Sequence, residues 1–299
     1  LGFESENDDF PKAKVVDWIS VPLGVATLKE QFNDVTDDSA KFALMSWFFE
    51  ESLANFAPYK DGIQTKEGFQ IVGTSGTVTT VAASHLGLDR YDRGKVDGLR
   101  MTSPQIENVI QSYLALGDSY TIGESVSEFE RWPVQLVASL AEENVFLNSP
   151  EIIAKTGWTT DELQEGINQA PLNYPYDWVS LLIGVNNQYR GKSIKEFENE
   201  FYNLLSQAIM FSGNRKERVF VLSIPDWGAM PYALDNDIQK IAEEIDAFNQ
   251  VIYQLCAKEN VRFIDITHLS RKVSDYANWI AKDGLHPSGT QYSKWVLEI

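Results

Sequence analysis

Short apolar runs alternate with amphipathic stretches through the C-terminal two thirds of the chain. The apolar runs have the length of β-strands and are rich in Val, Ile, Leu and aromatic residues. The amphipathic stretches place apolar residues at helical spacing. The predicted strands are 112–118, 151–157, 178–184, 218–225 and 261–267, and the predicted helices between them include 132–143, 160–169, 193–211 and 238–259.

This alternation predicts a parallel sheet with helices on both faces, because parallel strands need helical crossovers between them. The nearly continuous apolar character of the strands is typical of a sheet that is buried on both sides. We therefore expect an α/β domain over 112–299. Residues 1–111 have a different pattern, which indicates strand, helix, strand, helix and helix, and we expect them to form a separate segment.

Composition and charge narrow the classes of partner. The chain has 299 residues, which is room for one large domain or two ordinary ones, and a formal net charge of −18. Nucleic acids and anionic membranes need a positive field, so neither is expected as a partner. Three scattered histidines and one cysteine form no metal-ligand cluster, and we expect neither a metal nor another cofactor. The pattern leaves the oligomeric state open.

Cys256 lies in an apolar helical run and is expected to be a buried structural thiol; as the sole cysteine it has no intrachain disulfide partner. The chain contains no apolar stretch long enough to span a membrane. Its first ten residues are acidic and polar, unlike a signal peptide. A cytoplasmic location is the resulting expectation.

Residues with catalytic chemistry follow the predicted strands. Ser119 comes directly after the first strand, Gly157 ends the second, and Asn186 follows the third. Asp283 and His286 follow the fifth strand at a greater distance. Because active sites of open parallel sheets gather at the carboxyl ends of the strands, we expect these residues to lie close together.

The residue types suit acyl transfer. A serine hydroxyl is a weak nucleophile until a base takes its proton, and His286 is the predicted base for Ser119. Asp283, three residues earlier, can accept the Nδ1 proton and hold the ring in the correct tautomer. The backbone N–H groups of Ser119 and Gly157 and the side-chain amide of Asn186 are the predicted oxyanion donors.

These motifs resemble those of the SGNH hydrolases, a GDSL-like family of serine esterases. ALGDSYTIGE resembles the first block of the family, KTGW the second, GVNN the third and DGLHPS the fifth, in family order. The resemblance covers 112–299 and implies a three-layer α/β/α fold of the flavodoxin-like kind. It also implies the roles just given for Ser119, Gly157, Asn186, Asp283 and His286. The stretch SIPDWGAMP resembles one esterase branch, which places Trp227 in the substrate pocket.

The chain departs from the family pattern at two positions. Asn187 stands where the family often has Asp, which leaves open what this side chain contacts, and Tyr120 replaces the Leu of the GDSL motif. Asp118 is interpreted as structural, bonding to nearby backbone. His268, with Asp265 three residues before it, is a rival base, but its surroundings do not match the family block as those of His286 do.

The N-terminal segment resembles a second family. Two stretches between residues 13 and 110 are similar to exopolyphosphatases and guanosine pentaphosphate phosphohydrolases, which have an actin-like ATPase fold. The resemblance implies a partial lobe over 1–111 with a phosphate-binding loop formed by Gly73, Thr74, Ser75, Gly76 and Thr77. The lobe that holds that family's catalytic carboxylate is absent, so no phosphatase activity is expected. A fusion of two fragments is the interpretation that fits both resemblances.

The sequence therefore predicts a hydrolase that cleaves a small carboxylic ester through an acyl-serine intermediate, in the manner of an esterase or lysophospholipase. A carbohydrate O-acetylesterase is the alternative within the same chemistry. An alternative from a different functional class also stays open. In it the N-terminal segment is a remnant that binds phosphate or a nucleotide, and the hydrolase is fused to it.

Overall fold

A computed structural model describes residues 2–4, 12–14, 76–86, 88, 92–102, 105, 109, 111–143 and 145–299. The chain forms two compact units, Leu1–Leu99 and Arg100–Ile299. The predicted C-terminal domain, 112–299, lies within the second unit. The assignment of residues 1–111 and 112–299 to two domains stays a prediction.

The second unit is built on a five-stranded sheet in which every neighbouring pair is parallel. All five predicted strands are confirmed. Their spatial order is β4-β3-β5-β6-β7. The strands are β3 (Tyr113–Gly117), β4 (Glu151–Ala154), β5 (Trp178–Leu182), β6 (Val219–Leu222) and β7 (Arg262–Ile264).

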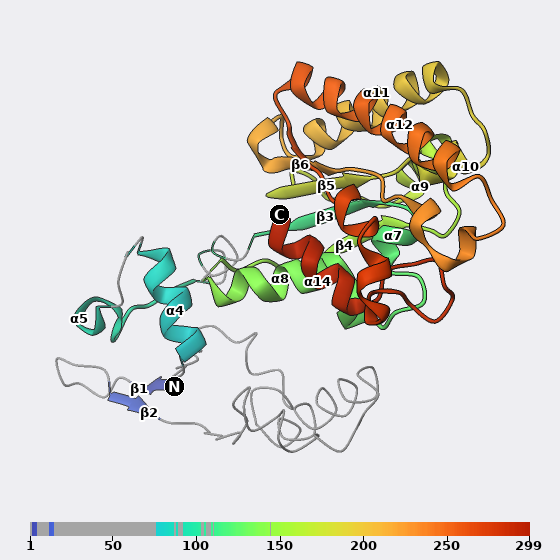
Figure 1. The fold of residues 1–299 in the computed structure, drawn as a ribbon. Helices are drawn as coiled ribbons and strands as arrows, with labels where there is room; N and C mark the ends of the chain where they lie inside the picture. Colours follow the sequence, from blue (N-terminus) through green and yellow to red (C-terminus); the bar gives the residue numbers. More distant parts are fainter. Residues whose placement is uncertain are drawn as a thin grey trace. The chain divides into compact units, whose positions relative to one another are not determined.

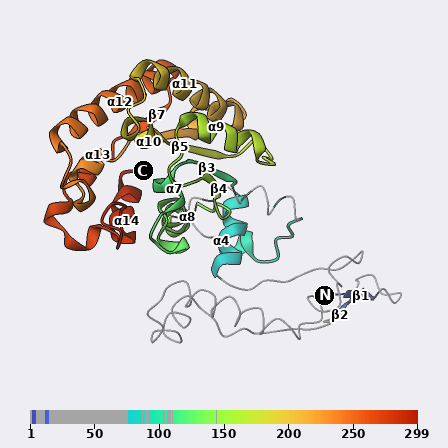
Figure 2. The same cartoon turned by 90° about the vertical axis from the view of Figure 1, so that its right-hand side faces the viewer.

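Helices cover both faces of this sheet and make a three-layer α/β/α unit (Figure 1). Helices α9, α11 and α12 lie on one face, and α8 and α14 lie on the other, as the turned view also shows (Figure 2). The helices are α7 (Ser119–Ile122), α8 (Trp132–Glu142), α9 (Thr160–Gln169), α10 (Val185–Tyr189), α11 (Ile194–Phe211), α12 (Ile238–Glu259), α13 (Thr267–Ser270) and α14 (Gly289–Glu298).

Short 3₁₀ turns complete the connections: η2 (Glu128–Glu130), η3 (Lys216–Arg218), η4 (Trp227–Ala229), η5 (Pro231–Ala233), η6 (Val273–Asp275) and η7 (Ala277–Trp279). The predicted long helices are confirmed within a residue or two at each end, which is the ordinary scatter of helix boundaries.

The core lies between the sheet and its two helical layers. Leu114, Leu116 and Leu181 on the central strands are completely buried, as their apolar runs predict. Phe197 and Phe201 on α11 are also completely buried, and their rings pack 5.4 Å apart between centroids. Cys256 on α12 is buried as predicted, and burial raises the pKa of its thiol to about 12.

The strand order decides where a site can form. The chain first adds β4 on one side of β3, and then adds β5, β6 and β7 in turn on the other side. The direction of winding therefore reverses between β3 and β5. In flavodoxin-like sheets, ligands bind in the crevice beyond the carboxyl ends of the strands at such a reversal. The segments that follow β3 and β5 therefore flank the expected position of the site.

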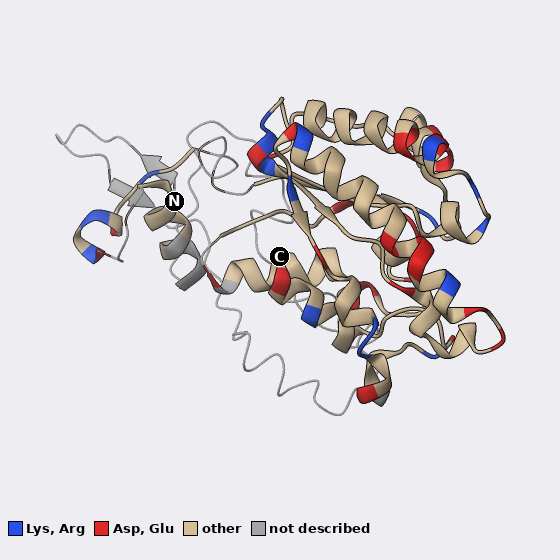
Figure 3. Cartoon of the chain, turned by 45° about the horizontal axis from the view of Figure 1, so that its top comes forward, with Lys and Arg blue, Asp and Glu red and all other residues tan. Residues whose placement is uncertain are grey.

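The surface of the described residues carries charges of both signs, interspersed along the helices (Figure 3). Within these residues, no helix combines the length and apolar character that crossing a membrane requires.

In the first unit, β1 (Gly2–Glu4) and β2 (Lys12–Lys14) form an antiparallel pair that the sequence pattern did not predict. The unit also contains α4 (Gly76–His85) and α5 (Arg93–Val96). The second helix predicted in this segment is confirmed as α4, which begins at Gly76, inside the predicted phosphate-binding loop. The strand predicted before it, and most of the segment predicted to form an actin-like lobe, lie outside the described residues.

Candidate active site

Ser119 begins α7 immediately beyond the carboxyl end of β3. The tight turn depends on Gly117, because a Cβ there would lie 2.1 Å from the Thr121 hydroxyl and 2.5 Å from the Leu182 carbonyl oxygen. Asp118 caps the helix, and its Oδ1 accepts the Tyr120 N–H at 3.0 Å. The turn thereby places Ser119 at the wall of a pocket. Ser119 itself is 4% exposed.

Asp118 bonds to nearby backbone, as predicted. Its carboxyl group is completely buried, and Oδ2 has no hydrogen-bond partner among the described residues. Burial raises the pKa of Asp118 to about 7, although the backbone N–H bond from Tyr120 acts to lower it. The neutral form of this carboxyl group is therefore favoured below about pH 7.

Ser119, His286 and Asp283 form one continuous hydrogen-bonded chain. His286 Nε2 lies 2.9 Å from Ser119 Oγ, and His286 Nδ1 lies 2.6 Å from Asp283 Oδ2. His286 is 6% exposed, and its ring packs against that of Tyr120 at a centroid distance of 5.2 Å. The structure thus brings together the three residues that the sequence predicts as a catalytic triad.

Asp283 is held as a carboxylate by four donors. Its Oδ1 accepts the backbone N–H groups of Leu285 at 2.9 Å and His286 at 3.0 Å, while Oδ2 accepts the His286 ring and the Ser125 hydroxyl, the latter at 2.7 Å. Partial burial alone would raise the pKa of Asp283, but these four hydrogen bonds outweigh it and hold the pKa well below its usual range. Asp283 is consequently ionised throughout the neutral pH range.

Gly157 lies in the turn after β4 with a φ of +84°, which a residue with a side chain rarely adopts. Its carbonyl oxygen accepts Arg190 Nη2 at 2.5 Å, and Arg190 also contacts the Glu162 carboxylate at 3.2 Å. Gly157 is not among the residues that line the pocket. The arginine bond nevertheless fixes the orientation of the peptide that follows this glycine.

Asn186 is on α10, directly beyond the carboxyl end of β5, and lines the pocket. Its Nδ2 donates to the Trp158 carbonyl oxygen at 2.9 Å, which leaves the second N–H of the amide for another acceptor. Asn187, the departure from the family pattern, is completely buried and bonds to Thr160 through both its amide oxygen and nitrogen. Hydrogen bonds from these two asparagines therefore link the segment after β5 to the segment after β4.

A pocket of about 120 Å³ lies in front of the serine. Among the residues predicted to form the site, Trp227 lines this pocket together with Ser119, Asn186 and His286. The pocket is completed by Tyr120, Val185, Tyr189, Tyr232 and Leu285. Most of these side chains are apolar or aromatic.

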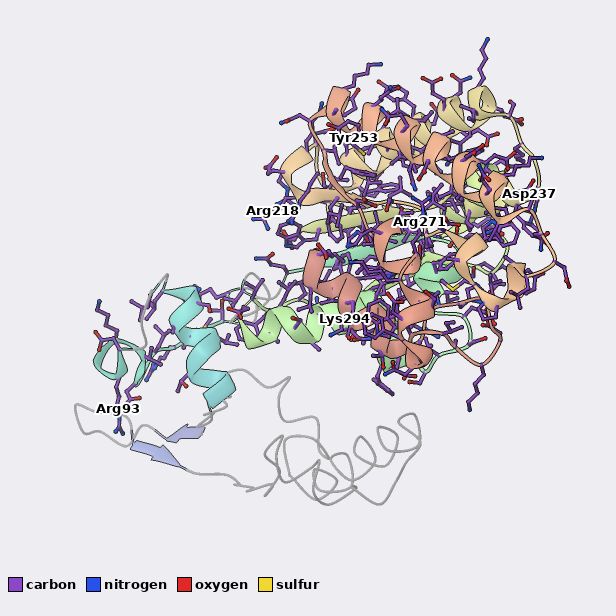
Figure 4. The ribbon with its side chains drawn as sticks, in the orientation of Figure 1. Arg93, Arg218, Asp237, Tyr253, Arg271 and Lys294 are labelled. Atoms are coloured by element: carbon purple, nitrogen blue, oxygen red, sulfur yellow. The ribbon has the colours of Figure 1, made fainter. Side chains whose placement is uncertain are left out.

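The wall formed by Trp227 is anchored on both sides. Its Nε1 donates to Gln188 Oε1 at 2.7 Å. Asp226, the residue before it, accepts a hydrogen bond from Arg271 Nε at 2.8 Å, and Arg271 Nη2 also donates to Asp246 at 2.8 Å. Arg271 is labelled in Figure 4. This anchoring gives the indole a fixed position in the pocket wall.

Tyr189, Tyr232 and Leu285 are among the pocket residues that the sequence does not predict. Tyr189 follows Asn186 by three residues, a spacing that places both on one face of a helix, so this signal was present in the sequence. Leu285 lies between Asp283 and His286 in the DGLHPS motif. Tyr232 had no local signal; its backbone N–H bonds to the Gly284 carbonyl at 3.0 Å, a contact that exists only in the fold.

His268, the alternative candidate for the base, lies away from Ser119 and the pocket. His268 Nε2 lies 3.5 Å from the Glu298 carboxylate, and His268 is not among the residues that line the pocket. In the predicted phosphate-binding loop, Gly73, Thr74 and Ser75 lie outside the described residues, whereas Gly76 and Thr77 begin α4. Phosphate binding there stays a prediction.

Comparison with family models identifies the class of protein. Residues 115–294 match the GDSL-like Lipase/Acylhydrolase family, and this stretch exceeds half of the chain. The chain belongs to this family. Its matched region includes all five predicted catalytic and oxyanion residues and extends from β3 into α14. Membership of the GDSL-like family confirms the prediction of an ester-hydrolysing enzyme for the C-terminal part of the chain.

Several solved structures are similar to this chain. A structure titled TesA is 17% identical, covers 63% of this chain and 95% of its own, and gives a TM-score of 0.51. The psychrotrophic esterase EstA from Pseudoalteromonas sp. is 15% identical, with coverage of 63% and 93% and a TM-score of 0.49. The acetylxylan esterase Axe2 from Geobacillus stearothermophilus is 19% identical, with coverage of 62% and 92% and a TM-score of 0.49. No match was found among curated proteins.

Proposed function

We propose that Ser119, His286 and Asp283 hydrolyse carboxylic esters through an acyl-Ser119 intermediate. The observation that carries this proposal is the hydrogen-bonded chain of 2.9 Å and 2.6 Å that joins the three side chains at the wall of a pocket. A hydroxyl, an imidazole and a carboxylate in this order are the arrangement that activates a serine for attack on a carbonyl carbon.

In the first half-reaction, His286 Nε2 takes the proton from Ser119 Oγ while Oγ bonds to the ester carbonyl carbon. Asp283 stabilises the resulting imidazolium through its 2.6 Å bond to Nδ1. The tetrahedral intermediate collapses when the alcohol leaves with the proton from Nε2. Water then repeats the sequence on the acyl-serine, and the products are a carboxylic acid and the free enzyme.

The oxyanion donors in this proposal are the backbone N–H groups of Ser119 and Gly157 and the Nδ2 group of Asn186. The Ser119 N–H begins α7, where the first N–H groups of a helix have no intrahelical acceptor. The bond from Asn186 Nδ2 to the Trp158 carbonyl supports the role of Asn186, because it orients the amide while one N–H stays available.

Asn186→Ala is expected to lower kcat for ester hydrolysis by about 10²- to 10³-fold with little change in KM. The removed donor stabilises the charge of the transition state more than it binds the neutral ester. Steady-state kinetics with p-nitrophenyl acetate would measure the change, and Asn199→Ala on the exposed face of α11 is the matched control. A variant with the kcat of the wild type would exclude Asn186 as an oxyanion donor.

The pocket favours a short acyl group. Its volume is about 120 Å³, and its lining includes Trp227, which is 5% exposed and whose ring meets that of Tyr189 edge-on at a centroid distance of 5.2 Å. We expect p-nitrophenyl acetate and butyrate to be hydrolysed with a higher kcat/KM than the octanoate and palmitate esters, in a spectrophotometric assay of the full chain. Folded protein that hydrolyses none of these esters would contradict the proposed function.

A carbohydrate O-acetylesterase is the second candidate. Tyr189 and Tyr232 at the pocket are 55% and 51% exposed, and their hydroxyl groups lie 3.5 Å apart. Exposed aromatic faces of this kind offer stacking surfaces for sugar rings. Release of acetate from acetylated xylo-oligosaccharides with a higher kcat/KM than from p-nitrophenyl acetate would favour this candidate over a general esterase.

A further inference from the structure

The segment directly after α7 makes a double left-handed turn. Gly123 and Ser125 have φ angles of +69° and +64°. Ser125 is one of three non-glycine residues with a positive φ in the part of the chain that the structure describes. The Glu124 N–H donates to the Ser119 carbonyl oxygen at 3.0 Å, and Val126 packs against the hydrophobic core. The position of this segment is thereby fixed relative to the serine.

Two adjacent side chains of this segment reach the other two segments of the site. The Ser125 hydroxyl donates to Asp283 Oδ2 at 2.7 Å. The Glu124 carboxylate accepts the hydroxyl of Thr156, the residue before Gly157. One short stretch of chain therefore joins the segment of the nucleophile to the segments that carry the acid and an oxyanion donor.

The bond from Ser125 falls on the carboxylate oxygen that faces the histidine. Asp283 Oδ1 is held by two backbone N–H groups, but Oδ2 accepts only side-chain donors, namely Ser125 and the ring of His286. Without the Ser125 hydroxyl, the His286 ring would be the one remaining hydrogen-bond partner of Oδ2 among the described residues. The side chain of Asp283 is 29% exposed, so Oδ2 would then bond to mobile water instead.

We propose that Ser125 is a positioning residue, which acts through Asp283 to hold the His286 ring in line with Ser119. Two observations support this proposal. The backbone of Ser125 is left-handed, and its hydroxyl donates at 2.7 Å to the Asp283 oxygen that faces the ring. This inference rests on the roles proposed above for Ser119, Asp283 and His286.

The first test compares Ser125→Ala and Ser125→Gly with the wild type, using p-nitrophenyl acetate. Both variants are expected to lower kcat about tenfold, as for loss of a hydrogen bond to a charged group, and to leave KM unchanged. Glycine adopts a positive φ without strain, so an equal loss in both variants assigns the effect to the hydroxyl and not to the backbone. Ser274→Ala, which removes an exposed hydroxyl beside Asp275, is the matched control.

The second test is a double-mutant cycle with Asp283→Ala. A residue that acts through Asp283 has no effect once that carboxylate is gone, so the double variant Ser125→Ala/Asp283→Ala is expected to have the kcat of Asp283→Ala alone. A purely structural role for Ser125 predicts the same tenfold loss in both backgrounds. Thermal unfolding of each variant accompanies the kinetics.

Two results would overturn the inference: an unchanged kcat in Ser125→Ala and Ser125→Gly, or an equal loss in the presence and absence of the Asp283 carboxylate. Failure of the proposed function would be visible separately. In that case Ser119→Ala would keep the activity of the wild type, whereas failure of the Ser125 inference alone leaves Ser119→Ala inactive.

Discussion

Ser119→Ala is expected to lower kcat for p-nitrophenyl acetate hydrolysis by about 10⁶-fold. The Oγ atom lies 2.9 Å from His286 Nε2 and supplies the electron pair that forms the acyl-enzyme, and alanine leaves no substitute for it. The oxyanion donors and the pocket stay in place, so a small residual rate over the uncatalysed reaction is expected to persist. Active-site-normalised kinetics at high enzyme concentration would measure the loss.

The control for this variant is Ser206→Ala, which removes an exposed hydroxyl on α11 that bonds to the Tyr202 carbonyl. It is expected to keep the kcat of the wild type. Both variants should unfold near the temperature of the wild type, because each loses one oxygen atom only. If Ser119→Ala retained more than a few per cent of the activity, Ser119 would not be the nucleophile.

Asp283→Asn is expected to lower kcat by about 10⁴-fold. The carboxylate accepts the Nδ1 proton at 2.6 Å and thereby leaves Nε2 free to take the proton of Ser119. An asparagine amide that turns its NH₂ toward the ring favours the opposite tautomer, in which Nε2 already carries a proton. KM should change little, since Asp283 is not among the pocket-lining residues.

Steady-state kinetics would test this prediction with Asp275→Asn as the control, since Asp275 lies in η6 and its Oδ1 accepts a hydrogen bond from Ser274. The pKa of Asp283 lies well below its usual range, so the wild type has the carboxylate at every pH used in an ester assay. An Asp283→Asn variant within tenfold of the wild type would show that the carboxylate does not orient the histidine.

The sequence predicted the sheet and the triad because both leave local signals. Each strand of the sheet is an apolar run bounded by polar residues, and the order of runs and helices restricts the topology. The nucleophile and the base are distant in the chain, yet Ser119 and His286 each lie in a short motif that identifies them. The structure confirms their contact at 2.9 Å.

The residues that the sequence did not predict depend on contacts between segments. Ser125 is an ordinary serine by sequence, and only its positive φ turns the hydroxyl toward Asp283. Tyr232 lines the pocket and is held there by a backbone bond to Gly284. Arg190 lies outside the pocket and bonds to the Gly157 carbonyl. Spacing along the chain contains no information about such pairs.

Mass spectrometry of the protein after reaction with a p-nitrophenyl alkylphosphonate would show whether Ser119 is the nucleophile. Such a reagent phosphonylates an activated serine and forms a stable mimic of the tetrahedral intermediate. We expect one phosphonyl group on the peptide that contains Ser119, with loss of esterase activity in proportion to labelling. Loss of activity with the label on another residue, or full activity with Ser119 completely labelled, would contradict this expectation.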